Sequence, residues 1–499
     1  MKCDQQQKIR TAATLLAVIL STASLQAAAQ SSTCPLNGWE EGLKRYLQLT
    51  FPFPISDTAN DTPQTPAPDC VFQQWSGEAF VWATALGADG VPRFMTMQTP
   101  DQLLSASAKQ NSKKGKLKLK LAGRSINTYG MAGFTEGAGA IVEADGNMLV
   151  GPNGYPVYAS VHMNSSYFNT AKKNLVATGG YVNQPKGSYF DPGAAVFKAT
   201  WLRVDSLDQV PAGAYITQAQ VPVLRVLRTK SNYAVVPIPN QYKTVTVALM
   251  GLHVVGYTTN HPEFLWATFE HNLNTPRVPD NQFSTSGSSQ TGYTFYAANT
   301  SYAQVNQANP PQSGQSYIPP QLNFNLATQK FSPSNNVVLE NQTGGASFGN
   351  GAADIAGVNT SLQGFYSAMI NPKTGAKYPQ AVFGNYNLIG TVWLQANSYM
   401  ESNPNVMSTG ASNAIGSVNL ANSTAETFQQ YPTNSNMNNV QNCFMCHNPT
   451  TLPNGNPGQP GNFPPRRISI SHVLEVGTPQ AVQNLLIVPI NNTQTTQTK

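Results

Sequence analysis

The hydrophobic pattern of this 499-residue chain predicts a protein built mainly from β-strands, with a few helices. Short apolar segments are separated by Asp-Gly at 145–146 and Asn-Gly at 153–154, pairs that are typical of tight hairpin turns. The predicted strands are residues 116–121, 140–143, 148–150, 157–163, 197–204, 215–227, 242–258, 386–393 and 468–476. We therefore expect an α+β fold, with a large β-rich body, long polar loops and a short C-terminal segment.

Two segments show helical signals instead. Residues 75–86 carry apolar side chains at helical spacing and stop at Gly87. Pro262 suits the first position of a helix, so residues 262–271 form the second predicted helix. Residues 280–365 are dominated by Ser, Asn, Gln, Thr and Gly, and we expect long loops with short strands there.

The N-terminus predicts export. A basic start, an apolar run over 15–20 and small residues at 27–29 are the features of a cleaved signal peptide. No later segment approaches the roughly 18 apolar residues of a membrane span, so no integral span is predicted. The periplasm is the expected location, with the outer surface or secretion as alternatives. The expected organisation is a signal peptide (1–29), an irregular N-terminal segment (30–74), a β-rich body (75–400) and a C-terminal segment packed on the body (401–499).

Charged residues make up only 10% of the chain, against about 25% in ordinary globular domains. The net charge of +6 is too mild to indicate a nucleic-acid partner. Residues 109–124 hold seven bases and no acid. Their lysines fit the outer side of an edge strand that is guarded against aggregation, and the alternative is a docking site for an acidic redox partner.

The cysteines give the strongest chemical signal. Cys443, Cys446 and His447 form a Cys-x-x-Cys-His motif, the spacing for covalent attachment of a c-type haem with the histidine as the proximal iron ligand. A zinc site would need further ligands nearby, and a redox disulfide would favour a thioredoxin-like context; the sequence offers neither. Cys34 and Cys70 remain once the signal peptide is removed, and we expect them to form a disulfide in an oxidising compartment.

Several further segments resemble a family of exported bacterial cytochrome-c-like proteins. The most specific one is Trp266-Ala267-Thr268-Phe269-Glu270-His271, and the C-terminal Cys-x-x-Cys-His accompanies it. The other matching segments are residues 198–201, His253, residues 261–265, residues 388–393 and residues 420–424. The resemblance implies an exported haem protein and supplies no substrate.

The second axial position of the iron is less defined, because no Met follows His447. His271 and His472 are the candidate distal ligands; an open position and a ligand elsewhere in the chain are the alternatives. His253 is expected to be a hydrogen-bonded core residue and His162 a solvated one, while His261 is expected to flank the start of the second predicted helix.

The sequence thus predicts one covalent haem c and an electron-transfer role with an unknown redox partner. A haem-dependent oxidoreductase of the peroxidase or oxidase type is the first alternative, and an exported binding protein with a structural or sensory haem is the second. Motif inspection reveals no zincin, nucleophile-elbow, phosphate-loop or dinucleotide signature.

Overall fold

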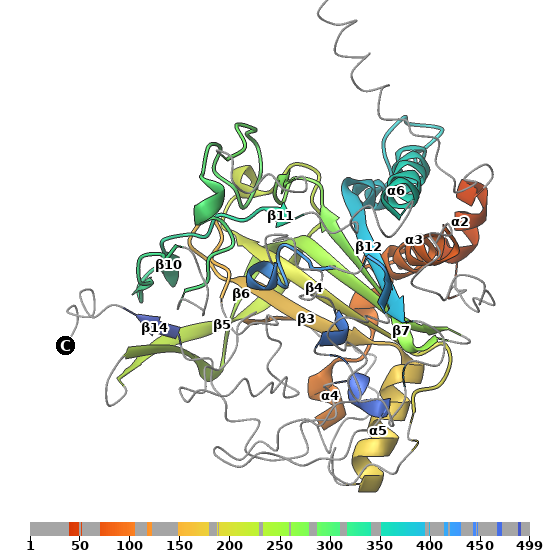
Figure 1. Cartoon of the computed structure of the whole chain (residues 1–499), viewed down its shortest axis with the longest axis horizontal. Coiled ribbons are helices and arrows are strands. Elements are labelled where there is room, and N and C mark those ends of the chain that lie inside the picture. Colours follow the sequence, from red (N-terminus) through yellow and green to blue (C-terminus); the bar gives the residue numbers. More distant parts are fainter. Residues whose placement is uncertain are drawn as a thin grey trace, which may run out of the picture.

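A mixed β-sheet forms the centre of the molecule (Figure 1). The computed structural model describes residues 39–48, 51, 70–104, 117–121, 148–178, 187, 189–228, 233–258, 261–278, 287–309, 317–340, 351–394, 399, 414–417, 420–430, 443–445, 447, 467–471 and 488–490. Within these residues the chain is mainly β with a few helices, which confirms the predicted fold class.

The described strands form a ten-stranded sheet and two small two-stranded sheets. The long strands are β3 (Val157–Met163), β4 (Ala195–Val204), β5 (Ile216–Arg228), β6 (Tyr233–Thr258), β7 (His261–His271) and β12 (Tyr386–Leu394). The short strands of the same sheet are β1 (Leu117–Lys118), β2 (Lys120–Leu121), β13 (Ala414–Gly416) and β14 (Val488–Ile490). The small sheets pair β8 (Arg277–Val278) with β11 (Leu339–Glu340), and β9 (Asn323–Asn325) with β10 (Lys330–Ser332).

Strand β6 organises the sheet because it is long enough to pair with four other strands, including the short β14 at its beginning. One of its edges pairs with β4, and the other pairs first with β5 and then with β7. Strand β12 continues the sheet on the far side of β7. The pairings are antiparallel except β1 with β5 and β8 with β11. Long apolar runs in β6 and β7 are explained by this central position, since both faces of these strands are covered.

Helices cover one face of the sheet and the ends of several strands. The α-helices are α2 (Trp39–Leu47), α3 (Cys70–Thr84), α4 (Pro100–Leu104), α5 (Ser165–Thr178) and α6 (Gly351–Ser367). The 3₁₀ helices are η1 (Arg93–Thr96), η3 (Leu207–Gln209), η4 (Tyr302–Gln304), η6 (Pro379–Asn385), η7 (Thr427–Gln429), η8 (Cys443–Met445) and η9 (Arg467–Ile470). Figure 1 shows α2, α3 and α6 grouped beside β7 and β12. None of the described helices combines the length and apolarity needed to cross a membrane.

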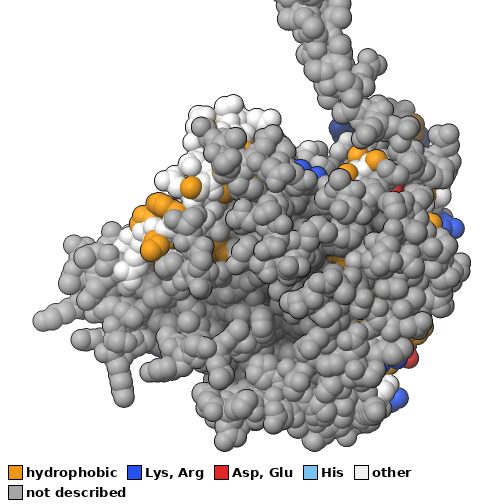
Figure 2. Space-filling model, viewed as in Figure 1, with side chains coloured by type: hydrophobic (Ala, Val, Ile, Leu, Met, Phe, Trp, Pro, Cys, Tyr) orange, Lys and Arg blue, Asp and Glu red, His pale blue; other side chains and the backbone are white. Residues whose placement is uncertain are grey.

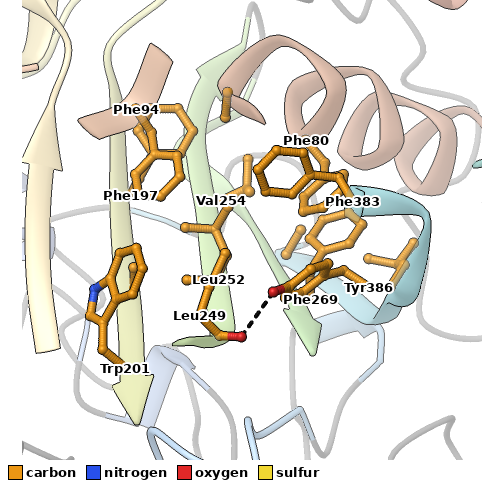
Figure 3. Close-up of a cluster of buried hydrophobic side chains, with 14 of the residues drawn as sticks. Phe80, Phe94, Phe197, Trp201, Leu249, Leu252, Val254, Phe269, Phe383 and Tyr386 are labelled. Carbon is orange, nitrogen blue, oxygen red and sulfur yellow. Dashed lines mark hydrogen bonds between the residues drawn. The ribbon is translucent and has the colours of Figure 1, made fainter. Parts of the chain in front are cut away.

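An aromatic core joins α3 to the sheet (Figure 3). The rings of Phe80 and Phe269 stack with centroids 4.2 Å apart, and Phe383 meets Phe80 edge-on. The hydroxyl of Tyr386 donates a hydrogen bond to the carbonyl of Leu249 at 2.9 Å, so its polar atom is satisfied inside this core. The predicted helix over 75–86 is confirmed and begins earlier, at Cys70.

The opposite face of the sheet is covered by a second apolar layer from distant parts of the chain. Its members include Tyr167 and Phe168 of α5, Leu420, Phe444, Ile468 and Ile470. Strand β7 divides its side chains between the two layers: Leu265, Ala267 and Phe269 lie in the α3 layer, whereas Trp266 lies in the second. This alternation places the C-terminal haem-motif segment on the face away from α3.

The helix predicted over 262–271 is wrong, because the segment is strand β7. The strand predicted over 468–476 is also wrong where it is described, since η9 replaces its start. Helix α2 lies within the segment expected to be irregular, and α6 lies within the expected loops. Residues 140–147 lie outside the described part. The strand predicted over 148–150 is wrong, because only an isolated bridge at Val150 is present, whereas β3 confirms the strand predicted over 157–163.

The described surface carries few charged side chains, in agreement with the low share of charged residues in the sequence. Figure 2 shows few charged side chains on its visible described surface and a group of exposed hydrophobic side chains over the β10 region. Large apolar side chains that are exposed in this part of the chain are Ile318 and Leu326. Lys118 is exposed in β1, as expected for a lysine guarding a strand edge.

Candidate functional site

The haem-attachment motif begins with a single tight turn. Cys443 opens η8, and the backbone N–H of His447 donates to the carbonyl of Cys443 at 2.8 Å. Cys443 and His447 are therefore one helical turn apart and belong to the same compact unit. Cys446 lies outside the described residues.

The imidazole of His447 is held by a backbone carbonyl. Its Nδ1 atom lies 2.9 Å from the carbonyl oxygen of Ile470 in η9. A carbonyl oxygen only accepts hydrogen bonds, so Nδ1 carries the hydrogen and the neutral ring has its lone pair on Nε2. This tautomer is the one an iron ligand needs, and metal-binding histidines usually have their second nitrogen held in this way.

Trp266 of β7 packs against the same imidazole. The two ring centroids are 4.4 Å apart, with an interplanar angle of 34°. The indole Nε1–H of Trp266 donates to the carbonyl of Glu263 at 2.8 Å, and Phe444 contacts the indole edge-on at 6.0 Å. The half-buried His447 is thus fixed between an indole face and a carbonyl oxygen.

A buried contact between a histidine and a glutamate stabilises the beginning of β7. His261 and Glu263 are both buried, with His261 Nδ1 2.9 Å from Glu263 Oε1. The same carboxylate oxygen accepts from the backbone N–H of Leu394 at 3.2 Å. Phe264 has a φ of 66°, a left-handed conformation that allows the Glu263 carbonyl to face the indole of Trp266.

Arg467 fixes the other side of the motif. The guanidinium lies over the ring of Tyr189 at 3.9 Å and also donates to the Tyr189 hydroxyl. The carbonyl of Arg467 accepts from the hydroxyl of Tyr399 at 2.6 Å. These contacts anchor η9, and η9 supplies the Ile470 carbonyl that binds His447. Burial raises the pKa of Tyr189, so this phenol remains a hydrogen-bonding group.

A buried polar network lies along the same face of β7, beyond Trp266. Residues 420–430, which we call the strap, cross this face, and Glu270 receives hydrogen bonds from the backbone N–H of Ser423 at 2.7 Å and from the Ser423 hydroxyl. The amide of Asn422 donates to the hydroxyl of Thr268 at 2.8 Å. Burial raises the pKa of Glu270, while the Ser423 contacts oppose that shift.

Side chains of two strands, β6 and β4, meet the carboxylate of Glu426 in this network. His253 Nε2 lies 3.0 Å from Glu426 Oε1, and Lys198 Nζ lies 3.8 Å from the same oxygen. Burial opposes ionisation of Glu426, but His253 and Lys198 outweigh it and lower the pKa of this carboxyl. His253 is therefore a hydrogen-bonded residue of the interior, as predicted.

The polar network brings together segments that carry the family resemblance. Lys198 and His253 are cross-strand partners, as are His253 and Thr268. Thr200 contacts Thr424 of the strap at 2.6 Å between their hydroxyl oxygens. A Cβ on the intervening Gly251 would lie 2.7 Å from the Asn422 amide, so the close approach of the strap requires a glycine.

The distal candidates are placed differently. His271 follows Phe269 in the β7 alternation, and its ring meets Tyr386 edge-on in the α3 layer. It lies five residues beyond Trp266, roughly 16 Å along an extended strand, so the structure does not bring it to His447. Burial lowers the pKa of His271 to about 4. His472 lies outside the described residues.

Other sequence predictions concern residues away from the motif. The prediction of a solvated His162 is wrong, because this side chain is buried, contacts Ser160 Oγ at 2.9 Å and meets Phe94 edge-on. Burial lowers its pKa to about 3. Cys70 is disulfide-bonded at the start of α3. Cys34 lies outside the described residues, so its pairing with Cys70 stays a prediction.

The residues around the motif fit a covalently bound haem. The chain supplies a sulfur donor in Cys443, an imidazole in the required tautomer and apolar rings from Trp266 and Phe444. Among the described side chains, no three His, Cys, Asp or Glu residues converge as a separate metal site. Comparison with family models, curated proteins and solved structures finds no match to the chain.

Sequence reasoning missed two contributors to this site. Trp266 was recognised as part of a matching string, but a helical assignment hid which face it occupies. The carbonyl of Ile470 left no sequence signal, since any residue provides a backbone oxygen. The period-two pattern of residues 265–270 could have revealed the strand, because three apolar side chains alternate with Trp266, Thr268 and Glu270.

Proposed function

We propose that this chain is an exported protein that carries one haem c and transfers electrons. Cys443 and Cys446 would form the covalent bonds to the haem, and His447 would bind the iron. The observation that carries the proposal is the hydrogen bond from His447 Nδ1 to the carbonyl of Ile470. It leaves Nε2 as the ligand nitrogen in a motif whose spacing already fits haem attachment.

Electron transfer is the role that the surroundings of His447 favour. The haem supplies one-electron chemistry when bound, and its potential depends on the axial ligand, hydrogen bonds to that ligand and burial. The chain orients the imidazole through Trp266 and Ile470 and surrounds it with the apolar second layer of the sheet. A firmly held His447 suits electron transfer, because the iron would gain and lose an electron without a change in the position of its ligand.

Haem attachment is tested by producing the full chain in cells competent in cytochrome c maturation. Denaturing electrophoresis with haem staining should leave colour on the polypeptide, and the pyridine haemochrome spectrum should show one c-type haem per chain. Cys443→Ser together with Cys446→Ser should abolish the stain. His253→Gln is the matched control, since His253 contacts Glu426 in the polar network, and it should keep the covalent haem. A wild-type chain without bound colour would refute the proposal.

Ligand access separates electron transfer from the oxidoreductase alternative. The visible spectrum is recorded before and after addition of cyanide, carbon monoxide or peroxide. A six-coordinate haem that ignores these ligands supports electron transfer, whereas an exchangeable position supports a peroxidase or oxidase. His472→Ala in the same assay shows whether that histidine occupies the second axial position, through a change from a low-spin to a high-spin spectrum.

Export to the periplasm is part of the proposal and rests on the N-terminal signal together with the haem motif. Cell fractionation should recover the haem-stained protein outside the cytoplasm. N-terminal sequencing should find residue 30 as the first residue of the mature chain. Recovery of full-length protein in the cytoplasmic fraction would contradict this part.

A further inference from the structure

The strongest unassigned feature of the molecule is the contact between Trp266 and His447. A side chain from the central sheet packs on the residue proposed to bind iron, with the two rings tilted by 34°, although the residues lie far apart in the sequence. Trp266 is 8% exposed and therefore nearly buried, and it belongs to the apolar layer that also holds Phe444 and Ile470. The contact links the haem-motif segment to the central sheet.

The indole itself has little freedom. Its Nε1–H donates to the Glu263 carbonyl, three residues earlier on the same strand. Val255 of β6 and Val392 of β12 are its cross-strand partners on the two sides. Side chains directly across neighbouring strands lie close together, so the two valines restrict the rotamers of Trp266.

Two contacts of the His447 imidazole restrict different movements of the ring. The Ile470 carbonyl defines the direction of Nδ1 and thereby that of Nε2, while the Trp266 face restricts rotation about the axis through these nitrogens. Loss of either contact would remove one of these two constraints. A hydrogen bond from Nδ1 also makes the imidazole a stronger donor to a metal.

We infer that Trp266 is the positioning residue for the axial ligand: its indole face fixes the imidazole plane of His447 and so preserves the Nδ1–H hydrogen bond to Ile470. The inference rests on the proposed haem function and extends it to the residue that tunes the centre. Trp266 acts through His447 and takes no part in electron transfer as a redox group.

The test compares Trp266→Phe, which keeps an aromatic face, with Trp266→Leu, which removes it. Trp393→Phe is the matched control, since Trp393 lies on β12 in the α3 layer and stacks on Phe72. In the haem-loaded protein, Trp266→Leu should change the ferric electron paramagnetic resonance g-values and raise the reduction potential, because a weaker Nδ1–H bond makes the imidazole a poorer donor. Trp266→Phe and Trp393→Phe should remain close to wild type.

A second readout does not depend on haem. In the full chain with Cys443→Ala and Cys446→Ala, the ring protons of His447 should be shifted upfield by the indole ring current, and Trp266→Leu should abolish the shift. If haem-loaded Trp266→Leu matches wild type in g-values and potential, the positioning role is refuted while haem attachment stands. If the wild-type chain binds no haem, the proposed function fails and this inference fails with it. An unshifted His447 in the chain that carries Cys443→Ala and Cys446→Ala would also overturn the inference.

Discussion

Glu340 is a carboxyl group that the fold keeps away from water. It is 2% exposed, and the amide of Asn306 donates to its Oε1 at 3.1 Å. Within the described part of the chain, its Oε2 atom has no hydrogen-bond partner. Burial raises the pKa of Glu340 from 4.5 to about 8, so the neutral acid is the stable form inside the protein at moderate pH.

This shift predicts a loss of stability as the pH rises. The folded state binds the proton more tightly than the unfolded state, so the contribution of Glu340 is fully present below about pH 4.5 and is lost as the pH rises to about 8. The loss approaches about 1.4 kcal/mol per pH unit within this window. Glu340→Gln resembles the neutral acid, and its free energy of unfolding should lack this decline. Urea denaturation at pH 5 and pH 8 measures the difference.

The exposed Glu41, which pairs with Lys44 on the surface of α2, provides the control. Glu41→Gln should differ from wild type by the same small amount at both pH values. If Glu340→Gln loses stability between pH 5 and pH 8 as steeply as wild type, Glu340 is ionised in the folded protein and the burial argument is wrong.

Gly251 lies where the strap packs so closely on β6 that the position has no room for a Cβ atom. A Cβ at this position would lie 2.7 Å from the Asn422 side chain and 2.8 Å from the hydroxyl of Thr200. Gly251→Ala should therefore destabilise the protein by about 1–3 kcal/mol, as overpacked interiors do. Gly364→Ala in α6 is the control: nothing lies within 4 Å of its Cβ, so it should stabilise the helix by about 0.5–1 kcal/mol. Chemical denaturation gives both values, and a neutral Gly251→Ala would show that the strap can move aside.

At the scale of elements, hydrogen bonds between buried residues join the strap to the sheet. Glu270 accepts two hydrogen bonds from Ser423, and both residues are buried. Removing one partner leaves the other buried and poorly satisfied, whereas removing both costs little more.

A double-mutant cycle with Glu270→Gln and Ser423→Ala should accordingly give a coupling energy of about 0.5–3 kcal/mol. The pair Ser423→Ala and Glu41→Gln should be additive, since Glu41 lies on α2 and bonds to Lys44. Urea denaturation of the single and double variants supplies the energies. Additivity of Glu270→Gln and Ser423→Ala would mean that other contacts hold the strap.

The same elements show what sequence reasoning can and cannot reach. Strands β4, β5 and β12 were predicted closely, because alternation and turn residues are local signals. For strand β7 the sequence predicts a helix, because Pro262 suits a helix start and the two covered faces of the strand blur its alternation. Helix α6 was missed because its composition is typical of loops, although five of its apolar residues recur at helical spacing (Ile355, Val358, Leu362, Phe365 and Tyr366).

The contacts that support the motif have no sequence signal for a different reason. The haem motif is contiguous, so its residues were evident, whereas its supports come from other strands and from a backbone oxygen. His162 was expected in water because its strand alternates, but Phe94 of η1 covers that face as well. Which faces are covered is a property of the tertiary structure, and a single strand does not contain that information.

At the scale of the whole molecule, three layers determine where a haem could be held. Helices α3 and α6 close one face of the sheet, and the second layer presents the Cys443–His447 unit on the other. The motif has no extended helical wrapping of its own in the described residues. The central sheet, through Trp266, therefore holds the imidazole of His447, the proposed iron ligand.

The disulfide of Cys70 acts on the same scale, because it constrains the first residue of α3. Cys70 is disulfide-bonded, and α3 packs against the sheet through Phe80 at the centre of the core. A bridge from Cys34 would close a loop of about 35 residues, for which chain entropy predicts a stabilisation of roughly 3–4 kcal/mol.

Cys34→Ala together with Cys70→Ala should lower the free energy of unfolding by about that amount. A reducing agent should lower the stability of wild type equally and leave the variant unchanged, because the variant has no bridge to lose. Mass spectrometry of unreduced peptides identifies the partner, and two alkylatable thiols at positions 34 and 70 would show that the bridge is absent.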